Sequence, residues 1–193
     1  MSVSLFISFN FLSAACMGWG PQCGVGVEEV YSESMNDTKV ESVWEYPRPP
    51  RMEESDRRLT IIHAGVTIAD TARAMRILET SHPPVYYIPQ TDIAMEYVKA
   101  SSRRGSFCEY KGIASYWSLD IGGKRVDDVA WSYAQPSASY AALKHYLAFY
   151  ANRVDTCTVD GEVVVPQPGD FYGGWITSHV KGPFKGAPGT LGW

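Results

Sequence analysis

Three pairs of β-branched or aromatic segments, each joined by a short turn, restrict this chain to an antiparallel β fold. The pairs are 59–63 with 66–70, 115–121 with 125–133, and 154–159 with 163–165. The turns contain Ala64-Gly65, Gly122-Gly123 and Asp160-Gly161. Tight hairpin turns need positive φ angles, which glycine adopts at no steric cost, and Asp-Gly is among the strongest of these signals. We therefore expect a mainly β domain built from hairpins.

The length and composition suit one domain. The chain has 193 residues, 45% of them hydrophobic, which is enough for a full core. We place this domain at 40–193 and treat residues 1–38 as a dispensable N-terminal extension. Residues 2–15 are apolar but too few to span a bilayer, and no basic residue precedes them as in a signal peptide. We expect a cytoplasmic protein, with secretion through an atypical signal as the alternative.

The charge and the cysteines exclude several classes of partner. The net charge is −4 and the cations are scattered, whereas nucleic-acid binders usually show a basic surplus or stripe. The 4 cysteines form no C-x-x-C pair, which favours free thiols over a disulfide framework. We expect no bound metal or cofactor, no nucleic-acid partner and no membrane partner.

Few segments have apolar residues at the spacing typical of a helix. Apolar residues in 72–80 follow a helical period, although a strand is an alternative over so few residues, and short helices are also expected near 91–99 and 140–145. Residues 44–50 should be extended because of their prolines. The tail, 168–193, is irregular in sequence, and we expect its aromatic side chains to dock on the sheet or on a neighbouring subunit of a homodimer. These side chains are Phe171, Tyr172, Trp175, Phe184 and Trp193.

A candidate site begins in segment 78–89, which crowds a carboxylate, an imidazole, two phenols and three prolines into one stretch. Two successive prolines fix the backbone after His82 and restrict the residue before each of them, so the imidazole should be held in one direction. Glu79 precedes this elbow, and Tyr86 and Tyr87 follow it. The same pattern also suits a tight structural corner.

Aromatic residues of the second hairpin extend this candidate site. Because strand side chains alternate, Trp131 and Tyr133 share one face, and Tyr116 can join them from the partner strand. Such a wall serves a planar ligand or a packed core equally well. Cys108 and Lys111 lie just before the hairpin. Lys111 is either an anchor for an anion, a base or Schiff-base amine, or the partner of Glu79 in a salt bridge.

Several segments of the chain resemble the DUF427 family, a group of uncharacterised bacterial and fungal proteins. These segments are 40–51, 69–71, 76–89, 107–112, 159–162 and 168–178. The resemblance covers about residues 40–193. It implies a small antiparallel fold similar to the β-tent (Mss4-like) group, in which two curved sheets form a concave mouth. It supplies no catalytic residues, although some family naming suggests a nucleotidyltransferase.

The residues give little support to that label or to zinc. Metal-dependent nucleotidyl transfer needs a Gly-Ser turn for the phosphates and two carboxylates that hold divalent ions. Gly105-Ser106 is present, but the adjacent Asp127 and Asp128 point to opposite faces of a strand unless a bulge intervenes. The paired Cys knuckles that often bind zinc in β-tent proteins are absent, and Cys108 with His82 supplies only two ligands.

Two functions remain from the sequence. The first is a binding module for a small planar or anionic metabolite. In it Lys111 and Arg76 pair with the negative charge of the ligand, and the aromatic residues contact the ligand together with Tyr86, Tyr87 and Cys108. The second is an enzyme acting on a small metabolite through Glu79, His82 and Lys111; Cys108 as a nucleophile with His82 as its base is a variant of it. We expect Glu79 and Lys111 to face each other across the mouth of the sheet. Convergence of the three groups favours the enzyme, and a lone Lys over aromatic rings favours binding.

Overall fold

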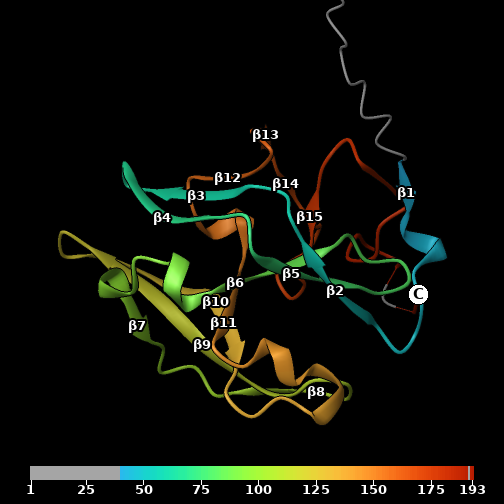
Figure 1. Cartoon of the computed structure of the whole chain (residues 1–193), viewed down its shortest axis with the longest axis horizontal. Helices are drawn as coiled ribbons and strands as arrows, with labels where there is room; N and C mark the ends of the chain where they lie inside the picture. Colours follow the sequence, from blue (N-terminus) through green and yellow to red (C-terminus); the bar gives the residue numbers. More distant parts are fainter. Residues whose placement is uncertain (1–39, 191) are drawn as a thin grey trace, which may run out of the picture. The chain divides into compact units, whose positions relative to one another are not determined.

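The computed structural model describes residues 40–190 and 192–193. These residues form several, largely antiparallel sheets connected by short 3-10 turns, so the predicted mainly β class is confirmed (Figure 1). The expected N-terminal extension, residues 1–38, lies outside the described residues. The closer likeness to a β-tent stays a prediction.

The larger sheet has eight strands in the order β2-β5-β6-β11-β10-β9-β7, with β8 paired to the beginning of β9. Its strands are β2 (Arg51–Ser55), β5 (Ala74–Leu78), β6 (Val85–Pro89), β7 (Val98–Ala100), β8 (Ser106–Cys108), β9 (Gly112–Ile121), β10 (Lys124–Tyr133) and β11 (Tyr146–Phe149). The hairpin of β9 and β10 contains its longest strands, and β6 and β11 extend the sheet on the other side of β10.

A four-stranded sheet in the order β13-β12-β3-β4 forms a separate layer (Figure 1). Its strands are β3 (Leu59–His63), β4 (Val66–Thr71), β12 (Thr156–Val159) and β13 (Glu162–Val163). Two short pairs complete the strands: β1 (Glu41–Ser42) with β16 (Val180–Lys181), and β14 (Val165–Pro166) with β15 (Trp175–Ile176).

The three predicted hairpins are confirmed, and their turns have the expected backbone. In each turn two successive residues have positive φ: 49° and 74° at Ala64 and Gly65, 57° and 78° at Gly122 and Gly123, 51° and 83° at Asp160 and Gly161. Two successive positive φ angles give a turn whose twist matches the twist of the strands it joins. These hairpins are therefore specified locally, by the turn residues themselves.

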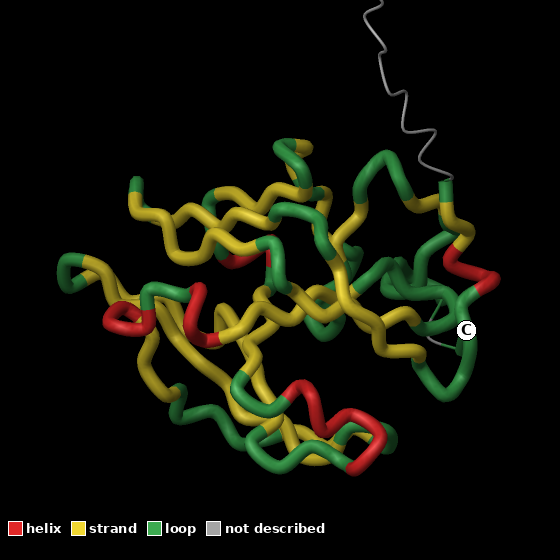
Figure 2. The backbone as a smooth tube through the Cα atoms, in the orientation of Figure 1, coloured by secondary structure: helices red, strands yellow, loops and turns green. Residues whose placement is uncertain are grey.

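The helical predictions are corrected. Residues 72–80 contain strand β5, the alternative left open above, because β2 and β6 pair with it on both sides. The other helical segments are short 3-10 turns between strands (Figure 2), since a few residues cannot sustain an α-helix without packing. The extended lead-in at 44–50 begins with such a turn. The turns are η1 (Val43–Glu45), η2 (Gln90–Asp92), η3 (Met95–Tyr97), η4 (Ala138–Leu143) and η5 (Ala151–Arg153).

The two faces of the eight-stranded sheet have different roles. One face packs against the four-stranded sheet and forms the main core, to which Leu59, Ile68, Ile88, Leu119 and Phe149 contribute. The opposite face carries an aromatic cluster that includes residues of β6, β9, β10 and η4. Because side chains alternate along each strand, neighbouring residues of β6 enter different clusters.

The C-terminal tail docks on the edge of these layers. Trp175 is 1% exposed, and its Nε1 donates a hydrogen bond to the Phe149 carbonyl at 3.0 Å. The backbone N–H groups of Trp175 and Lys185 donate to carbonyls of the elbow, those of Pro84 and Ser81, both at 2.8 Å. Phe171 is 60% exposed within this chain, so for its side chain the docking stays a prediction. The tail is thus tied to the elbow that carries His82.

Candidate functional site

A cavity of about 230 Å³ lies on the aromatic face of the eight-stranded sheet. Its wall comes from the β5–β6 elbow, strands β6, β8, β9 and β10, and the tail. The residues that line it are Ile77, Glu79, His82, Val85, Tyr87, Ser106, Phe107, Cys108, Tyr110, Lys111, Ala114, Tyr116, Trp131, Tyr133, Tyr150, Gln167, Phe171, Tyr172, Gly173 and Lys185. The segments are far apart in sequence, so the cavity exists only in the folded domain.

The elbow that precedes β6 is held by backbone contacts. Ser81 is fully buried and has a φ of 68°, an uncommon conformation for a residue with a side chain. Its N–H donates to the Val43 carbonyl at 3.0 Å, and the His82 N–H donates to the Glu79 carbonyl at 2.9 Å. A strained backbone that the surroundings fix in this way is common at binding sites. The elbow therefore presents His82 in one orientation.

The tautomer of His82 follows from the side chain of Gln167. The Gly174 N–H donates to Gln167 Oε1 at 3.0 Å, which leaves the Gln167 amide NH2 facing the Lys185 carbonyl at 2.8 Å and His82 Nδ1 at 3.0 Å. The NH2 group can only donate, so Nδ1 of the imidazole accepts. The proton of the neutral imidazole is then on Nε2, which keeps a donor available at the cavity wall.

His82 stays neutral at physiological pH. Burial, followed by the positive charges of Lys185, Arg48 and Lys111, lowers the pKa of His82 to about 4. Three cations near one uncharged imidazole make this end of the cavity electropositive. A negatively charged ligand is favoured there.

Lys111 lies in the turn between β8 and β9 and is 7% exposed. Its Nζ lies 5.7 Å from the centroid of the Tyr140 ring. Within residues 40–190 and 192–193 its ammonium group forms no ion pair with a carboxylate, although charged side chains at such depth are nearly always paired. The cavity wall thus contains a buried cation whose ammonium group lies over one aromatic ring, that of Tyr140, and not beside a described carboxylate.

The Glu79 carboxylate does not form a salt bridge with Lys111, which was one of the alternatives for this lysine. Glu79 Oε1 lies 3.4 Å from Nε of Arg48, which comes from the segment before β2. Both Glu79 and Lys111 line the cavity. Glu79 pairs with Arg48 instead, because the first residues of the domain fold back beside the elbow. The salt bridge, one of the alternatives left open by the sequence, is thus not formed, and the placement of the two residues across one mouth stays a prediction.

Aromatic rings form the remaining wall. Trp131 Nε1 donates to the Tyr87 hydroxyl at 3.2 Å, and the ring centroids of Trp131 and Tyr150 are 4.5 Å apart. Burial raises the pKa of Tyr87 and of Tyr133, so both phenols keep their protons at physiological pH. Tyr116 shares a hydrogen bond of 2.7 Å with Ser106. This part of the cavity wall is formed by aromatic rings and carries protonated hydroxyls.

Most of the residues predicted for the site meet here. Glu79, His82 and Lys111 line the cavity, and so do the predicted ligand contacts of the aromatic wall, namely Tyr87, Cys108, Tyr116, Trp131 and Tyr133. Arg76 and Tyr86 do not line it. They occupy the opposite face of β5 and β6, where they are paired in register, and Tyr86 packs against Trp175 in the main core.

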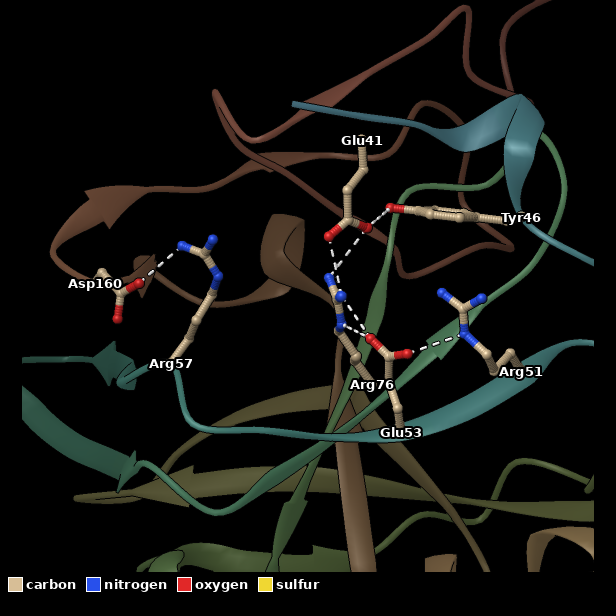
Figure 3. A network of polar contacts seen from close by, with 7 residues as sticks. All are labelled: Glu41, Tyr46, Arg51, Glu53, Arg57, Arg76 and Asp160. Atoms are coloured by element: carbon tan, nitrogen blue, oxygen red, sulfur yellow. Dashed lines mark hydrogen bonds and ion pairs between the residues drawn. The ribbon is translucent and has the colours of Figure 1, made fainter. Parts of the chain in front are cut away.

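Arg76 instead belongs to a polar network on that opposite face (Figure 3). Its guanidinium contacts Glu41 at 3.0 Å and also binds Glu53, while the Tyr46 hydroxyl donates to Glu41 at 2.6 Å. Burial acts to lower the pKa of Arg76, but the hydrogen bonds and charges of Glu41 and Glu53 outweigh it and raise that pKa. Two carboxylates neutralise this arginine, so it has no free charge for a ligand.

Residues 51–160 match the family model described as a domain of unknown function, DUF427. The match covers more than half of the chain. The chain belongs to the DUF427 family. The predicted membership is thus confirmed, and no curated protein matches the chain. The matched segment contains the elbow, Cys108, Lys111 and the β9–β10 hairpin, whereas the tail that closes the cavity follows it.

Residues of the site that were not predicted from the sequence of this DUF427 chain come from the tail, from Gln167 just before it and from the end of β11. Gln167 fixes the His82 tautomer, Lys185 adds charge, and Tyr172 packs edge-on against His82 with ring centroids 4.6 Å apart. Tyr150 follows β11 and completes the aromatic wall. The Gly- and aromatic-rich tail was the available signal, but nothing local indicated which strand it would cover.

Carboxylates of the β10 strand form no metal site in the described part of this DUF427 domain. A bulge does occur between Val126 and Ala130, but Asp127 binds Arg125 and Ser118, while Asp128 binds Ser101. No group of three His, Cys, Asp or Glu side chains among residues 40–190 and 192–193 is arranged to hold a metal ion. None of the helices described has the length and apolar character that crossing a membrane requires.

Gly173 gives a direct test of how closely the tail covers the cavity. A Cβ at this position would lie 2.3 Å from Cη2 of Trp131, so Gly173→Ala should push the indole into the cavity. We expect a loss of roughly 1–3 kcal/mol in the free energy of unfolding, as for other overpacked sites. Thermal denaturation measures it. Gly192→Ala is the matched control, because no atom lies within 4 Å of a Cβ there; equal effects would contradict the close approach.

Proposed function

We propose that this DUF427 protein binds a small anionic metabolite in the aromatic cavity. The observation that carries the proposal is Lys111, a cation that is 7% exposed, lines the cavity and has no carboxylate partner in the described residues. A buried charge without a partner is costly, and a bound anion would remove that cost. The cations that depress the pKa of His82 add to the attraction.

The geometry gives less support to an acid–base enzyme. Glu79, His82 and Lys111 line one cavity but form no hydrogen bonds with one another among the described contacts. Glu79 binds Arg48, His82 Nδ1 binds Gln167, and Lys111 lies over Tyr140. General acid–base catalysis needs groups that converge within hydrogen-bond reach of the same reacting atoms. A lysine over an aromatic ring, apart from the carboxylate and the imidazole, is the arrangement that favours binding.

Removal of the Lys111 charge should weaken anion binding and leave the fold intact. A library of small metabolites is screened by thermal shift at fixed ionic strength, and each hit is measured by calorimetry with wild type, Lys111→Met and Lys124→Met. We expect anions among the hits and a roughly 10- to 100-fold higher Kd for Lys111→Met, as for loss of a charged hydrogen bond. Lys124 is the control because it is exposed at the start of β10.

Two results would contradict the proposal. The first is a screen in which anions give no shift, since an occupied site at a hundredfold excess of ligand over Kd should raise the melting temperature by roughly 5–10 °C. The second is an anion that binds Lys111→Met as tightly as wild type, which would place its site elsewhere.

A further inference from the structure

We infer that the metabolite is a single-ring aromatic carboxylic acid, held with its carboxylate at Lys111 and His82 and its ring between the aromatic walls. This inference rests on the proposed function and specifies the ligand of the same cavity. Three independent properties of the cavity lead to it: its volume, the number and type of its donors, and the chemistry of its aromatic wall.

The volume limits the size of the ligand. The cavity measures about 230 Å³, while an apolar cavity of about 150 Å³ holds one benzene molecule. By that proportion the cavity holds about nine non-hydrogen atoms. A benzene ring with one carboxylate, which has about nine non-hydrogen atoms, is of this size. A nucleotide is far larger, so its base and phosphates do not fit inside together.

The donors match one carboxylate. Lys111 supplies the cation without a carboxylate partner, and His82 supplies an uncharged N–H from Nε2, as the bonds of Gln167 require. The other nearby cations are held by hydrogen bonds or ion pairs: Arg48 contacts Glu79, and Lys185 Nζ donates to the Trp193 carbonyl oxygen at 2.6 Å, which holds the ammonium group in place but leaves its charge. Among the described residues Lys111 is thus the cation of the cavity wall without a hydrogen-bond or ion-pair partner, and together with the neutral N–H of His82 it suits a singly charged group with two acceptor oxygens.

The aromatic part of the wall suits a flat ring. Tyr87, Trp131 and Tyr150 are each less than about a tenth exposed, and their rings are tilted or edge-on to one another. Gly173 lies against Trp131 so closely that no side chain can separate the tail from the indole. A planar ring placed here buries its faces on aromatic groups. A saturated ring of the same length is puckered and therefore packs less closely against them.

Titration calorimetry of the full chain at pH 7 tests the inference with four probes. They are benzoate, benzamide, cyclohexanecarboxylate and inorganic phosphate. We expect benzoate to bind, benzamide and cyclohexanecarboxylate to bind at least about tenfold more weakly, and phosphate to bind more weakly still. His82→Gln and Lys111→Met should each raise the Kd of benzoate about tenfold or more, whereas Lys124→Met should leave it unchanged.

Each other outcome contradicts one component of the inferred ligand or of the proposed site. Equal binding of benzamide removes the carboxylate from the inference, and equal binding of cyclohexanecarboxylate removes the aromatic ring. Phosphate binding that depends on Lys111 in the absence of benzoate binding overturns the aromatic acid but supports the proposed anion site. If none of the three anions binds and the metabolite screen yields no anion, the inference and the proposed function both fall.

Discussion

Trp175→Ala should lower the free energy of unfolding of this domain by roughly 3–5 kcal/mol, more than any substitution in the cavity wall. The indole is 1% exposed, packs against Tyr86 with ring centroids 5.5 Å apart, and donates to the Phe149 carbonyl. Its removal leaves a cavity in the main core and an unpaired carbonyl. Urea denaturation measures the loss, which corresponds to a fall of roughly 10–15 °C in melting temperature.

The control for this substitution is Trp44→Ala. Trp44 also donates its indole N–H to a carbonyl, that of Pro183 at 2.9 Å, but it is 43% exposed. We expect a loss of about 1 kcal/mol, because little apolar surface returns to water. A Trp175→Ala variant no less stable than Trp44→Ala would mean that the tail does not belong to the core of the domain.

Acidification should destabilise the domain through His82. In the unfolded chain the imidazole has its ordinary pKa of 6.5, whereas in the folded protein burial and nearby cations lower that pKa to about 4. Between these values the unfolded state binds more protons, so the free energy of unfolding falls as the pH falls. The stability is fully present above pH 6.5 and decreases by roughly 3 kcal/mol by pH 4.

The variant that isolates this effect is His82→Gln, which cannot titrate. Urea denaturation is repeated from pH 7.5 to pH 4 for both proteins, and the wild-type curve should fall toward the curve of the variant in the acidic range. Carboxylates titrate in both proteins and cancel in the difference. His145→Asn removes an exposed imidazole and serves as the matched control. Parallel curves for wild type and His82→Gln would show that His82 is not a buried neutral imidazole.

The sequence determined the elements whose structure depends on a few neighbouring residues. The turns at Gly65, Gly122-Gly123 and Gly161 need positive φ angles, which restrict the backbone whatever the rest of the chain does. Alternation along β10 placed Trp131 and Tyr133 on one face for the same reason. The prolines after His82 likewise fixed the elbow. Hence the β class, the hairpins and most of the cavity wall could be predicted.

Only the tertiary structure decided which face of each strand meets the cavity and what completes it. Ile77 and Tyr87 each follow directly after Arg76 and Tyr86 in sequence, but they line the cavity. Arg76 and Tyr86 lie on the other face, where the polar network and the four-stranded sheet cover them. Glu79 forms its ion pair with Arg48 and not with Lys111. Gln167, which is 85 residues from His82 in sequence, determines the tautomer of that imidazole. Such contacts depend on how distant segments pack, and no local pattern of residue types encodes that packing.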